Sequence, residues 1–382
     1  MRRLTGKHSI PIVILACALV LSVLSGRAVE TLSPKLSDNE FWQLVTSFSE
    51  PDGFFHSDNF VSNERSFQHV LDELAVGRQP GSAYVGVGPE QNFTYLLAIK
   101  PKIAFIVDIR RQNLIEHLMY KALFELSADR AEFLSRLLSR SRPPGLNSKS
   151  TVEDLFSAYG RTETDPQILQ DNLRSIKKRL LQDHGFVLSS EDEFSLERVA
   201  RAFTIGGENL TYDGPVEGRG ARTVTGIMPT FEELMMETDA EGKHRSFLAS
   251  EENFRTIQDL QKKNLIVPVV GNFAGPHALR SVGQYLRNHG ATVTAFYTSN
   301  VEQYLFMDRS WKDFYENVST LPIDARSVFV RGVIRAATGE YSSSPVLPLT
   351  SRYETKLFPV GTLVDAFNGG TIQRYNDILD AR

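Results

Sequence analysis

The sequence predicts an α/β protein in three layers, with helices on both faces of one mainly parallel sheet. Two observations carry this prediction. Residues 82–126 and 264–297 each follow the order strand, glycine-containing turn, helix and strand, which is the order of a βαβ unit. Between them, residues 127–255 carry helical patterns, so we expect a helical insertion within a single domain that spans residues 30–382.

The composition is that of a globular protein with a sizeable core. The chain has 382 residues, of which 41% are hydrophobic, and its single cysteine, Cys17, excludes a disulfide framework and a cysteine-rich zinc site. No His-Glu-x-x-His pair occurs either, so no metal is predicted. The first 28 residues carry four positive charges and no acid, so the formal net charge of −4 becomes −8 without them. This charge argues against a nucleic-acid partner. The partner we expect is a small-molecule ligand, for which candidate residues are given below.

The N-terminal segment has the organisation of a secretory signal. Residues 1–8 are basic, residues 10–24 are an apolar run, and the small residues Gly26 and Ala28 follow, which predicts a signal peptide over residues 1–28. An uncleaved membrane anchor is the alternative, although the run is shorter than the ~20 residues that a spanning helix needs. We therefore expect a protein that is exported, periplasmic or extracellular, or held in the inner membrane by this run alone.

Two helical stretches and a loop precede the first predicted strand. Ser37–Glu40 supplies capping residues before an apolar helical face, and residues 67–74 form a second amphipathic stretch that ends before Gly77. Residues 58–64 between them are polar and predict a loop. Together with His56, this loop could fold over a ligand site as a flap, but we expect it to be exposed to solvent.

The first βαβ unit is the most informative block. Residues 83–87 predict a short strand, residues 90–99 a helix, and residues 103–107 a continuous apolar strand that ends at Asp108. A continuous apolar run of this length is typical of a strand buried on both faces of a parallel sheet. A further helix is expected over residues 114–126.

The predicted insertion contains a basic surface and a glycine-rich segment. Arg136 and Arg140 lie one helical turn apart beside Arg130 and Arg142, and we interpret this basic face as a solvated helix surface. A contact with an anion or a membrane headgroup is the alternative. Residues 206–226 contain six glycines, and this predicts a mobile loop or hairpin that could act as a lid.

The α/β pattern then returns towards the C-terminus. Residues 265–270 predict a buried strand, residues 271–275 a turn and residues 276–288 a helix that proline opens. Further strands are expected over residues 291–297 and 327–334.

The turn after the first strand is the best candidate for a ligand site. Ligands of parallel sheets bind outside the carboxyl ends of the strands, and Gly86–Asn92 is such a turn. Asp108 lies 20 residues after Gly88, where an acid can accept hydrogen bonds from both hydroxyls of a ribose, as in dinucleotide sites and in the S-adenosylmethionine site of methyltransferases. The candidate cofactor-binding residues are Gly86, Gly88, Asn92, Asp108 and Ile109.

The match to these patterns is incomplete. Gln91 stands where the dinucleotide pattern has a third glycine, so a pyrophosphate could not approach the helix start closely. Tyr84 and Glu90 stand where the methyltransferase pattern has an acid and a glycine. The alternative is a tight turn whose glycines serve backbone geometry, with Asp108 capping the next helix.

A second turn reaches the same edge of the sheet. In methyltransferase-like folds the end of the fourth strand faces the transferable methyl group, and we assign this place to residues 265–270. Asn272 and Phe273 then become candidate substrate contacts, and Tyr297 at the next strand end is a third. A turn-forming asparagine beside a core phenylalanine is the alternative.

The sequence resembles a group of uncharacterised bacterial proteins with a Rossmann-like core of methyltransferase type. The resemblance runs from about residue 40 to the end, and it implies this fold and a pocket of S-adenosylmethionine type, but no established reaction. Its most distinctive stretches are Ser57–Asn59, Ser62–Glu64, Gly86–Phe93, Asp108–Arg111, Glu116–Ala122 and Phe296–Leu305.

Two hypotheses follow, and the sequence leaves open whether the protein is an enzyme. In the first, the domain binds S-adenosylmethionine or a similar nucleoside ligand. In the second, it is a non-catalytic exported binding protein on the same fold. The predicted export conflicts with the first hypothesis, because S-adenosylmethionine is made and kept in the cytoplasm.

Overall fold

The computed structural model describes residues 31–77, 79, 81–215, 228–335 and 352–380. The predicted signal segment, residues 1–28, lies outside these residues, as does much of the glycine-rich segment. Within the described residues, no helix is both long and apolar enough to cross a membrane.

One sheet of six strands organises the described residues, in the order β3-β2-β1-β4-β5-β6. Neighbouring strands from β3 to β5 pair in parallel, and β6 runs antiparallel to β5. This confirms an α/β fold with a mostly parallel sheet. The chain order reverses between β1 and β4. The strands are β1 (Ala83–Gly86), β2 (Ile103–Asp108), β3 (Ile266–Val270), β4 (Val293–Ser299), β5 (Val328–Arg335) and β6 (Arg352–Pro359).

The central strands are buried on both faces. Every residue of β1, β2 and β3 is buried, which is why their sequences are continuous apolar runs rather than alternating ones. β4 is buried up to Thr298, and its register against β5 shifts between Tyr297 and Ser299. At the end of β4, Ser299 has a left-handed φ of 51°.

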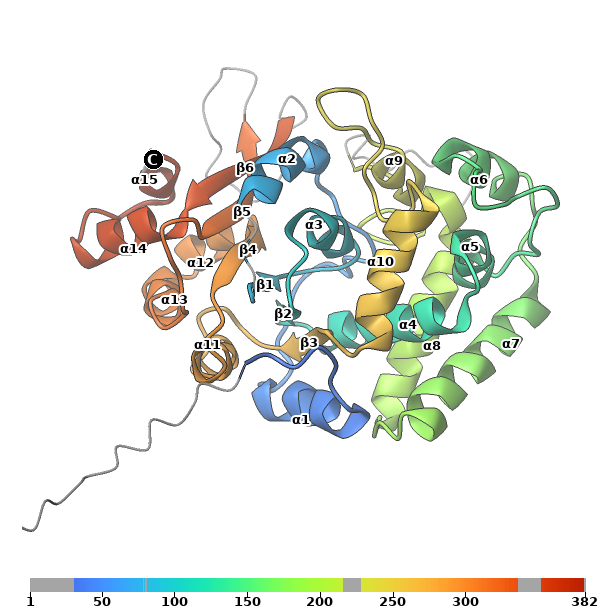
Figure 1. Cartoon of the computed structure of the whole chain (residues 1–382), viewed down its shortest axis with the longest axis horizontal. Helices are drawn as coiled ribbons and strands as arrows, with labels where there is room; N and C mark the ends of the chain where they lie inside the picture. Colours follow the sequence, from blue (N-terminus) through green and yellow to red (C-terminus); the bar gives the residue numbers. More distant parts are fainter. Residues whose placement is uncertain (1–30, 78, 80, 216–227, 336–351, 381–382) are drawn as a thin grey trace, which may run out of the picture.

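Helices cover both faces of the sheet, so the molecule has three layers (Figure 1). One face is covered by α3 (Gln91–Ile99), α4 (Arg111–Leu126) and α10 (Glu251–Lys262), with α2 (Leu71–Val76) and η1 (Phe67–Val70) beside them. The other face carries α1 (Asp38–Phe48), α11 (Ala278–Asn288), α12 (Val301–Met307), α13 (Trp311–Val318), α14 (Val360–Asn368) and α15 (Tyr375–Asp380).

The segment between α4 and β3 is helical in the described residues and packs against α4. Its core is an aromatic cluster in which Phe124 contacts Phe133, Phe247 and Phe254, with ring centroids 4.6–5.8 Å apart. Its elements are α5 (Arg130–Leu138), α6 (Val152–Tyr159), α7 (Pro166–Lys177), the π-helix η2 (Lys178–Asp183), α8 (Ser190–Gly206), η3 (Gly207–Asn209), α9 (Phe231–Met235) and α10.

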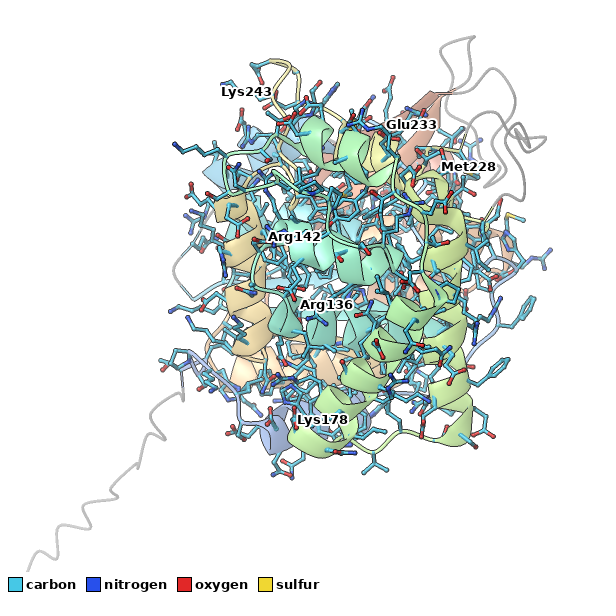
Figure 2. The ribbon with its side chains drawn as sticks, turned by 90° about the vertical axis from the view of Figure 1, so that its right-hand side faces the viewer. Arg136, Arg142, Lys178, Met228, Glu233 and Lys243 are labelled. Carbon is cyan, nitrogen blue, oxygen red and sulfur yellow. The ribbon has the colours of Figure 1, made fainter. Side chains whose placement is uncertain are left out.

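Figure 2 looks onto this helical side, where Arg136 and Arg142 are labelled. The predicted basic face is paired with acids: Arg136 contacts Glu132 at 2.6 Å and Arg142 contacts Asp129 at 2.8 Å. Arg140 likewise pairs with Glu208 at 2.7 Å. These arginines therefore hold helices and loops of the insertion together.

The assignment of residues 265–270 to the fourth strand is wrong. They form β3, an edge strand that pairs only with β2 in the described sheet, and the fourth strand is Val293–Ser299. The physical reason is that no described residue between β2 and β3 joins the sheet, because the insertion is helical. The strand next to β1 is therefore β4. Tyr297 and Ser299 belong to this strand, whereas Asn272 follows the edge strand β3.

Candidate functional site

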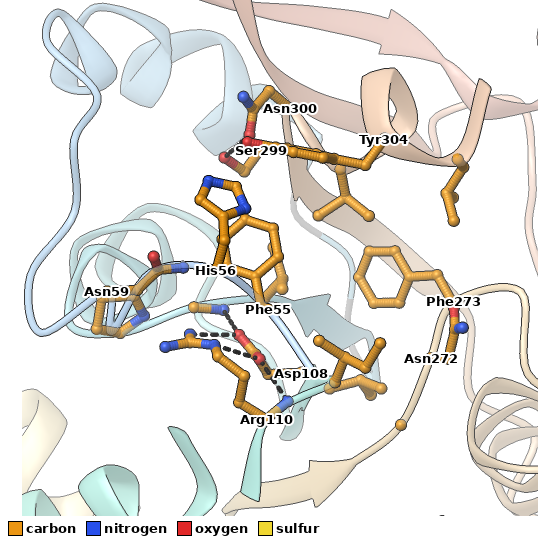
Figure 3. Close-up of a pocket in the computed structure, with 18 of the residues that line it drawn as sticks. Phe55, His56, Asn59, Asp108, Arg110, Asn272, Phe273, Ser299, Asn300 and Tyr304 are labelled. Atoms are coloured by element: carbon orange, nitrogen blue, oxygen red, sulfur yellow. Dashed lines mark hydrogen bonds and ion pairs between the residues drawn. The ribbon is translucent and has the colours of Figure 1, made fainter. Parts of the chain in front are cut away.

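A cavity of about 280 Å3 lies at the carboxyl ends of β1, β2, β3 and β4. It opens where the strand order reverses between β1 and β4, which is the position where open α/β sheets bind their ligands. Figure 3 shows it, with Asp108 and Arg110 on one side, Asn272 and Phe273 on another, and the ends of β4 and α12 opposite.

The structure brings most of the sequence-predicted residues together in this cavity. Its walls include Gly88, Asp108, Ile109, Asn272, Phe273 and Tyr297. Two predicted residues, Gly86 and Asn92, are buried behind the turn and do not line it.

Gly86 and Asn92 shape the turn from behind. The Asn92 side-chain amide donates to the carbonyl oxygens of Val87 (2.9 Å), Gly88 (3.1 Å) and Pro89 (2.7 Å). Its oxygen accepts from the Tyr84 hydroxyl at 2.8 Å, and a Cβ added at Gly86 would overlap that oxygen. These two residues therefore fix the backbone of the turn. This agrees with the alternative given above, in which the glycines of the turn serve backbone geometry rather than ligand binding.

Asp108 is buried and fully engaged by the protein. Its Oδ1 accepts from the Arg110 backbone N–H (2.9 Å) and from Arg110 Nε (3.1 Å), and its Oδ2 accepts from Arg110 Nη2 (2.9 Å) and the Gly88 backbone N–H (3.2 Å). Burial opposes the charge of Arg110, but Asp108 outweighs it and raises the pKa of Arg110. The pair anchors the turn to the end of β2.

A strap, residues 53–63, crosses the cavity. Its Phe55, His56 and Asn59 line the cavity, and its Phe60 and Val61 are buried. The expectation of a solvent-exposed loop is therefore wrong, and the flap alternative describes the segment better.

Contacts with distant parts of the chain explain the order of the strap. The Gly53 N–H donates to the Ile109 carbonyl at 2.9 Å, the Ser57 hydroxyl donates to Asp213 at 2.7 Å, and Arg110 Nη1 donates to the Asp58 carbonyl. Ser57 and Asp58 of the strap thus pair with distant parts of the protein.

Aromatic rings form one wall of the cavity. The Phe55 ring lies 4.3 Å from the His56 ring and 5.1 Å from the Tyr304 ring, in the second case edge to face. Phe273 on the far side stacks at 5.8 Å on Phe314 in the core. Flat aromatic walls suit a ligand with a planar ring.

Sequence reasoning missed Glu64 as a site residue. This fully buried carboxylate accepts from the Tyr297 hydroxyl (2.9 Å), the Ser299 hydroxyl, the Gln91 amide (3.1 Å) and the Thr355 hydroxyl (3.4 Å). Burial raises the pKa of Glu64. Glu64, which directly follows the strap, thereby links it to the Tyr297 and Ser299 hydroxyls of β4. Its stretch was distinctive in the sequence, but no local pattern placed it under β4.

Further buried acids lie behind the turn. Glu90 accepts from the Ser62 N–H at 3.1 Å, and burial raises the pKa of Glu90 to about 7. Glu116 on α4 has no hydrogen-bond partner for either oxygen among the described residues, and burial and the nearby Glu90 raise its pKa. His117 Nε2 donates to the Gly88 carbonyl at 2.9 Å, and burial lowers the pKa of His117 to about 4. These groups favour their neutral forms.

The cavity offers little to an anionic ligand. Arg110 is the only lysine or arginine among the described lining residues, and Asp108 already pairs with it. The start of α11 is occupied by the protein itself, because the Glu50 carboxylate accepts from the N–H groups of Asn272, His277 and Ala278. In the described part of the chain, no group of three or more His, Cys, Asp or Glu side chains is placed to hold a metal ion.

Comparison with protein families matches the chain to a family described as "Domain of unknown function (DUF7790)". The matched residues are 59–197 and 219–358, which together make up more than half of the chain. They include the end of the strap, Asp108, Arg110 and all of β1 to β5. Comparison with curated proteins finds no match.

Proposed function

We propose that this chain, which belongs to the DUF7790 family, binds a small molecule of nucleoside type, S-adenosylmethionine or a similar ligand, in the cavity at the ends of β1 to β4. The observation that carries the proposal is the convergence of six sequence-predicted residues on one cavity. They come from four separate strand ends, and the cavity lies at the reversal of strand order.

The topology supports a Rossmann-like core of methyltransferase type. The strand order is that of doubly wound nucleotide-binding sheets, with the last strand reversed. The helical insertion between α4 and β3 and the strap are additions to this core. Fold similarity alone does not specify a reaction, so the proposal names none.

The lining residues fit one part of such a ligand better than another. Ile109, Phe273 and the aromatic wall suit a planar base. A pyrophosphate finds no unpaired lysine or arginine among the described lining residues and meets Gln91 in place of a glycine, which favours a nucleoside over a dinucleotide. A ribose finds Asp108 in the expected place, but with its oxygens engaged by Arg110 and Gly88.

Isothermal titration calorimetry of the purified full-length protein tests the proposal. We expect S-adenosylmethionine, S-adenosylhomocysteine or adenosine to bind, and NAD to bind more weakly. Val301→Trp adds volume at the cavity wall and should weaken binding at least tenfold, about 1.4 kcal/mol. Val187→Trp changes an exposed residue that does not line the cavity and should leave binding intact. No heat with any nucleoside, in protein that circular dichroism shows to be folded, would refute the proposal.

The second candidate function is a non-catalytic exported binding protein on the same fold. The complete engagement of Asp108 by Arg110 and Gly88 favours it, because here the acid serves the turn. Mass spectrometry of small molecules retained by the native protein distinguishes the candidates: a non-nucleoside ligand supports the second. A C-terminal alkaline phosphatase fusion tests export, and an inactive fusion would contradict it.

A further inference from the structure

We propose that Arg110 determines which ligands the cavity accepts, by competing with the paired hydroxyls of a ligand for the carboxylate of Asp108. The inference rests on the proposed function and assigns a specificity-determining residue to the same site. It follows from the hydrogen bonds of Asp108, their burial and the contact of Arg110 with the strap.

Arg110 fills most of the acceptor capacity of Asp108. A carboxylate offers about four lone-pair positions, and Asp108 receives four hydrogen bonds, three of them from Arg110. Two of these three come from the guanidinium, through Nε at 3.1 Å and Nη2 at 2.9 Å. To bind a vicinal diol, each carboxylate oxygen of Asp108 must accept a hydrogen bond from one of the two hydroxyls. Because the guanidinium occupies both oxygens, the diol can bind Asp108 only after the guanidinium has moved.

The arginine is held firmly enough to compete. Its side chain is 7% exposed and that of Asp108 is 5% exposed, and charge-assisted forks of this kind are stronger than neutral hydrogen bonds. The remaining Nη1 donates to the Asp58 carbonyl in the strap. Displacement of the guanidinium would therefore also release one anchor of the strap, so diol binding and strap movement are coupled.

The consequence is a selectivity that the bare position of Asp108 does not predict. With Arg110 in place, the cavity should gain little from a second ribose hydroxyl. With the fork removed, Asp108 should recognise the diol as an acid at this strand end does in nucleotide-binding sheets.

Adenosine and 2′-deoxyadenosine are the probes that test this, because they differ by one hydroxyl. We expect the full-length protein to bind both with similar affinity. Arg110→Met removes the fork and should improve adenosine binding at least tenfold while leaving 2′-deoxyadenosine nearly unchanged. Arg110→Met leaves the buried Asp108 without its positive partner and could fail to fold. In that case Arg110→Lys replaces it, because lysine keeps the positive charge but cannot form the fork, and adenosine affinity should again increase.

Arg111→Met is the matched control. Arg111 is the neighbouring arginine, pairs with Asp192 and does not line the cavity, so its loss should not change either affinity. Folded Arg110 variants that bind adenosine no better than the unchanged protein would overturn the role of Arg110 and leave the proposed function standing. If neither nucleoside binds any of these proteins, the proposed function itself is wrong, and the role of Arg110 falls with it.

Discussion

Single buried residues behind the turn should control how stability depends on pH. Glu90 has a pKa of about 7 in the folded protein, above its ordinary 4.5, because it is fully buried. The neutral acid is thus favoured by folding. Glu90 therefore contributes stability that is fully present below pH 4.5 and is lost as the pH rises through about 7.

Glu90→Gln should remove this dependence. The difference between the two pKa values corresponds to a loss on the order of 3 kcal/mol for the unchanged protein between pH 4.5 and pH 8. Glu90→Gln should lose less unfolding free energy over this range, so its stability relative to the unchanged protein should rise with pH. Urea unfolding at several pH values measures this. Glu252→Gln, which changes an exposed acid on α10, is the control, and parallel curves for Glu90→Gln and the unchanged protein would contradict the buried-acid argument.

His117 should act in the opposite direction. Burial lowers the pKa of His117 from 6.5 to about 4, so its contribution to stability is present above pH 6.5 and is lost as the pH falls through about 4. His117→Gln retains a donor for the Gly88 carbonyl and cannot become charged. Relative to this variant, the unchanged protein should lose on the order of 3 kcal/mol between pH 6.5 and pH 4. Thermal unfolding at pH values between 6.5 and 4 measures this loss. His69→Gln, which changes an exposed histidine, is the control and should follow the unchanged protein.

Among the elements, α11 depends on a residue far away in sequence. The Glu50 carboxylate accepts from the backbone N–H groups of Asn272 (2.9 Å), His277 (2.8 Å) and Ala278 (2.8 Å), and so closes the β3–α11 turn. Glu50→Ala leaves these donors without their carboxylate and should cost about 2 kcal/mol of unfolding free energy. Glu73→Ala, at an exposed acid of α2, should cost less than about 0.5 kcal/mol. An equal effect of the two changes would mean that solvent replaces Glu50 as the cap.

The sequence predicted elements whose signals are local. β1 and β2 appear as apolar runs, the turn after β1 as glycines and the start of α1 as a capping box, and all four features form where the patterns indicated. For the same reason, residues at a strand end or within two residues of one, such as Asp108 and Asn272, were found and do line the cavity.

The predictions that were wrong or incomplete concern features that depend on how the chain folds beyond its local pattern. The strap is ordered by partners such as Asp213, 156 residues from Ser57, and no period or spacing in the sequence reveals them. The engagement of Asp108 by Arg110 was missed because hydrogen bonds between residues two apart depend on how the chain turns after the strand. The place of β3 in the sheet was missed because it depends on whether the insertion adds a strand to the sheet. The sequence does not reveal this, and the observed strand pairing shows that no described residue of the insertion does so.

At the scale of the whole molecule, a buried polar network joins the three parts of the fold. Lys121 of α4 donates to Glu125 (2.7 Å), to the Gln261 carbonyl (2.6 Å) and to Asn264 beside β3. His184, which follows η2 in the insertion, lies between Glu125 (2.7 Å) and Asp38 of α1 (2.8 Å). The insertion, the sheet and the α1 layer are thus connected through side chains that are mostly buried.

This connection predicts that the insertion and the sheet unfold together. The two tryptophans, Trp42 on α1 and Trp311 on α13, report on the helical layer opposite α4, whereas far-UV circular dichroism is dominated by the many helices, including those of the insertion. We expect both signals to change in one coincident transition on urea unfolding. An insertion that folds independently would give separate transitions.

Lys121→Met should shift that single transition without splitting it. The change leaves Glu125 buried without its lysine, and breaking a buried pair in this way costs roughly 3–5 kcal/mol. Lys263→Met breaks a more exposed pair with Asp259 and should cost less than about 1 kcal/mol. If Lys121→Met moves the circular dichroism transition but leaves the tryptophan transition in place, the network does not couple the layers and the insertion behaves as a separate unit. Coincident transitions at lower urea would instead establish that the layers share one cooperative core.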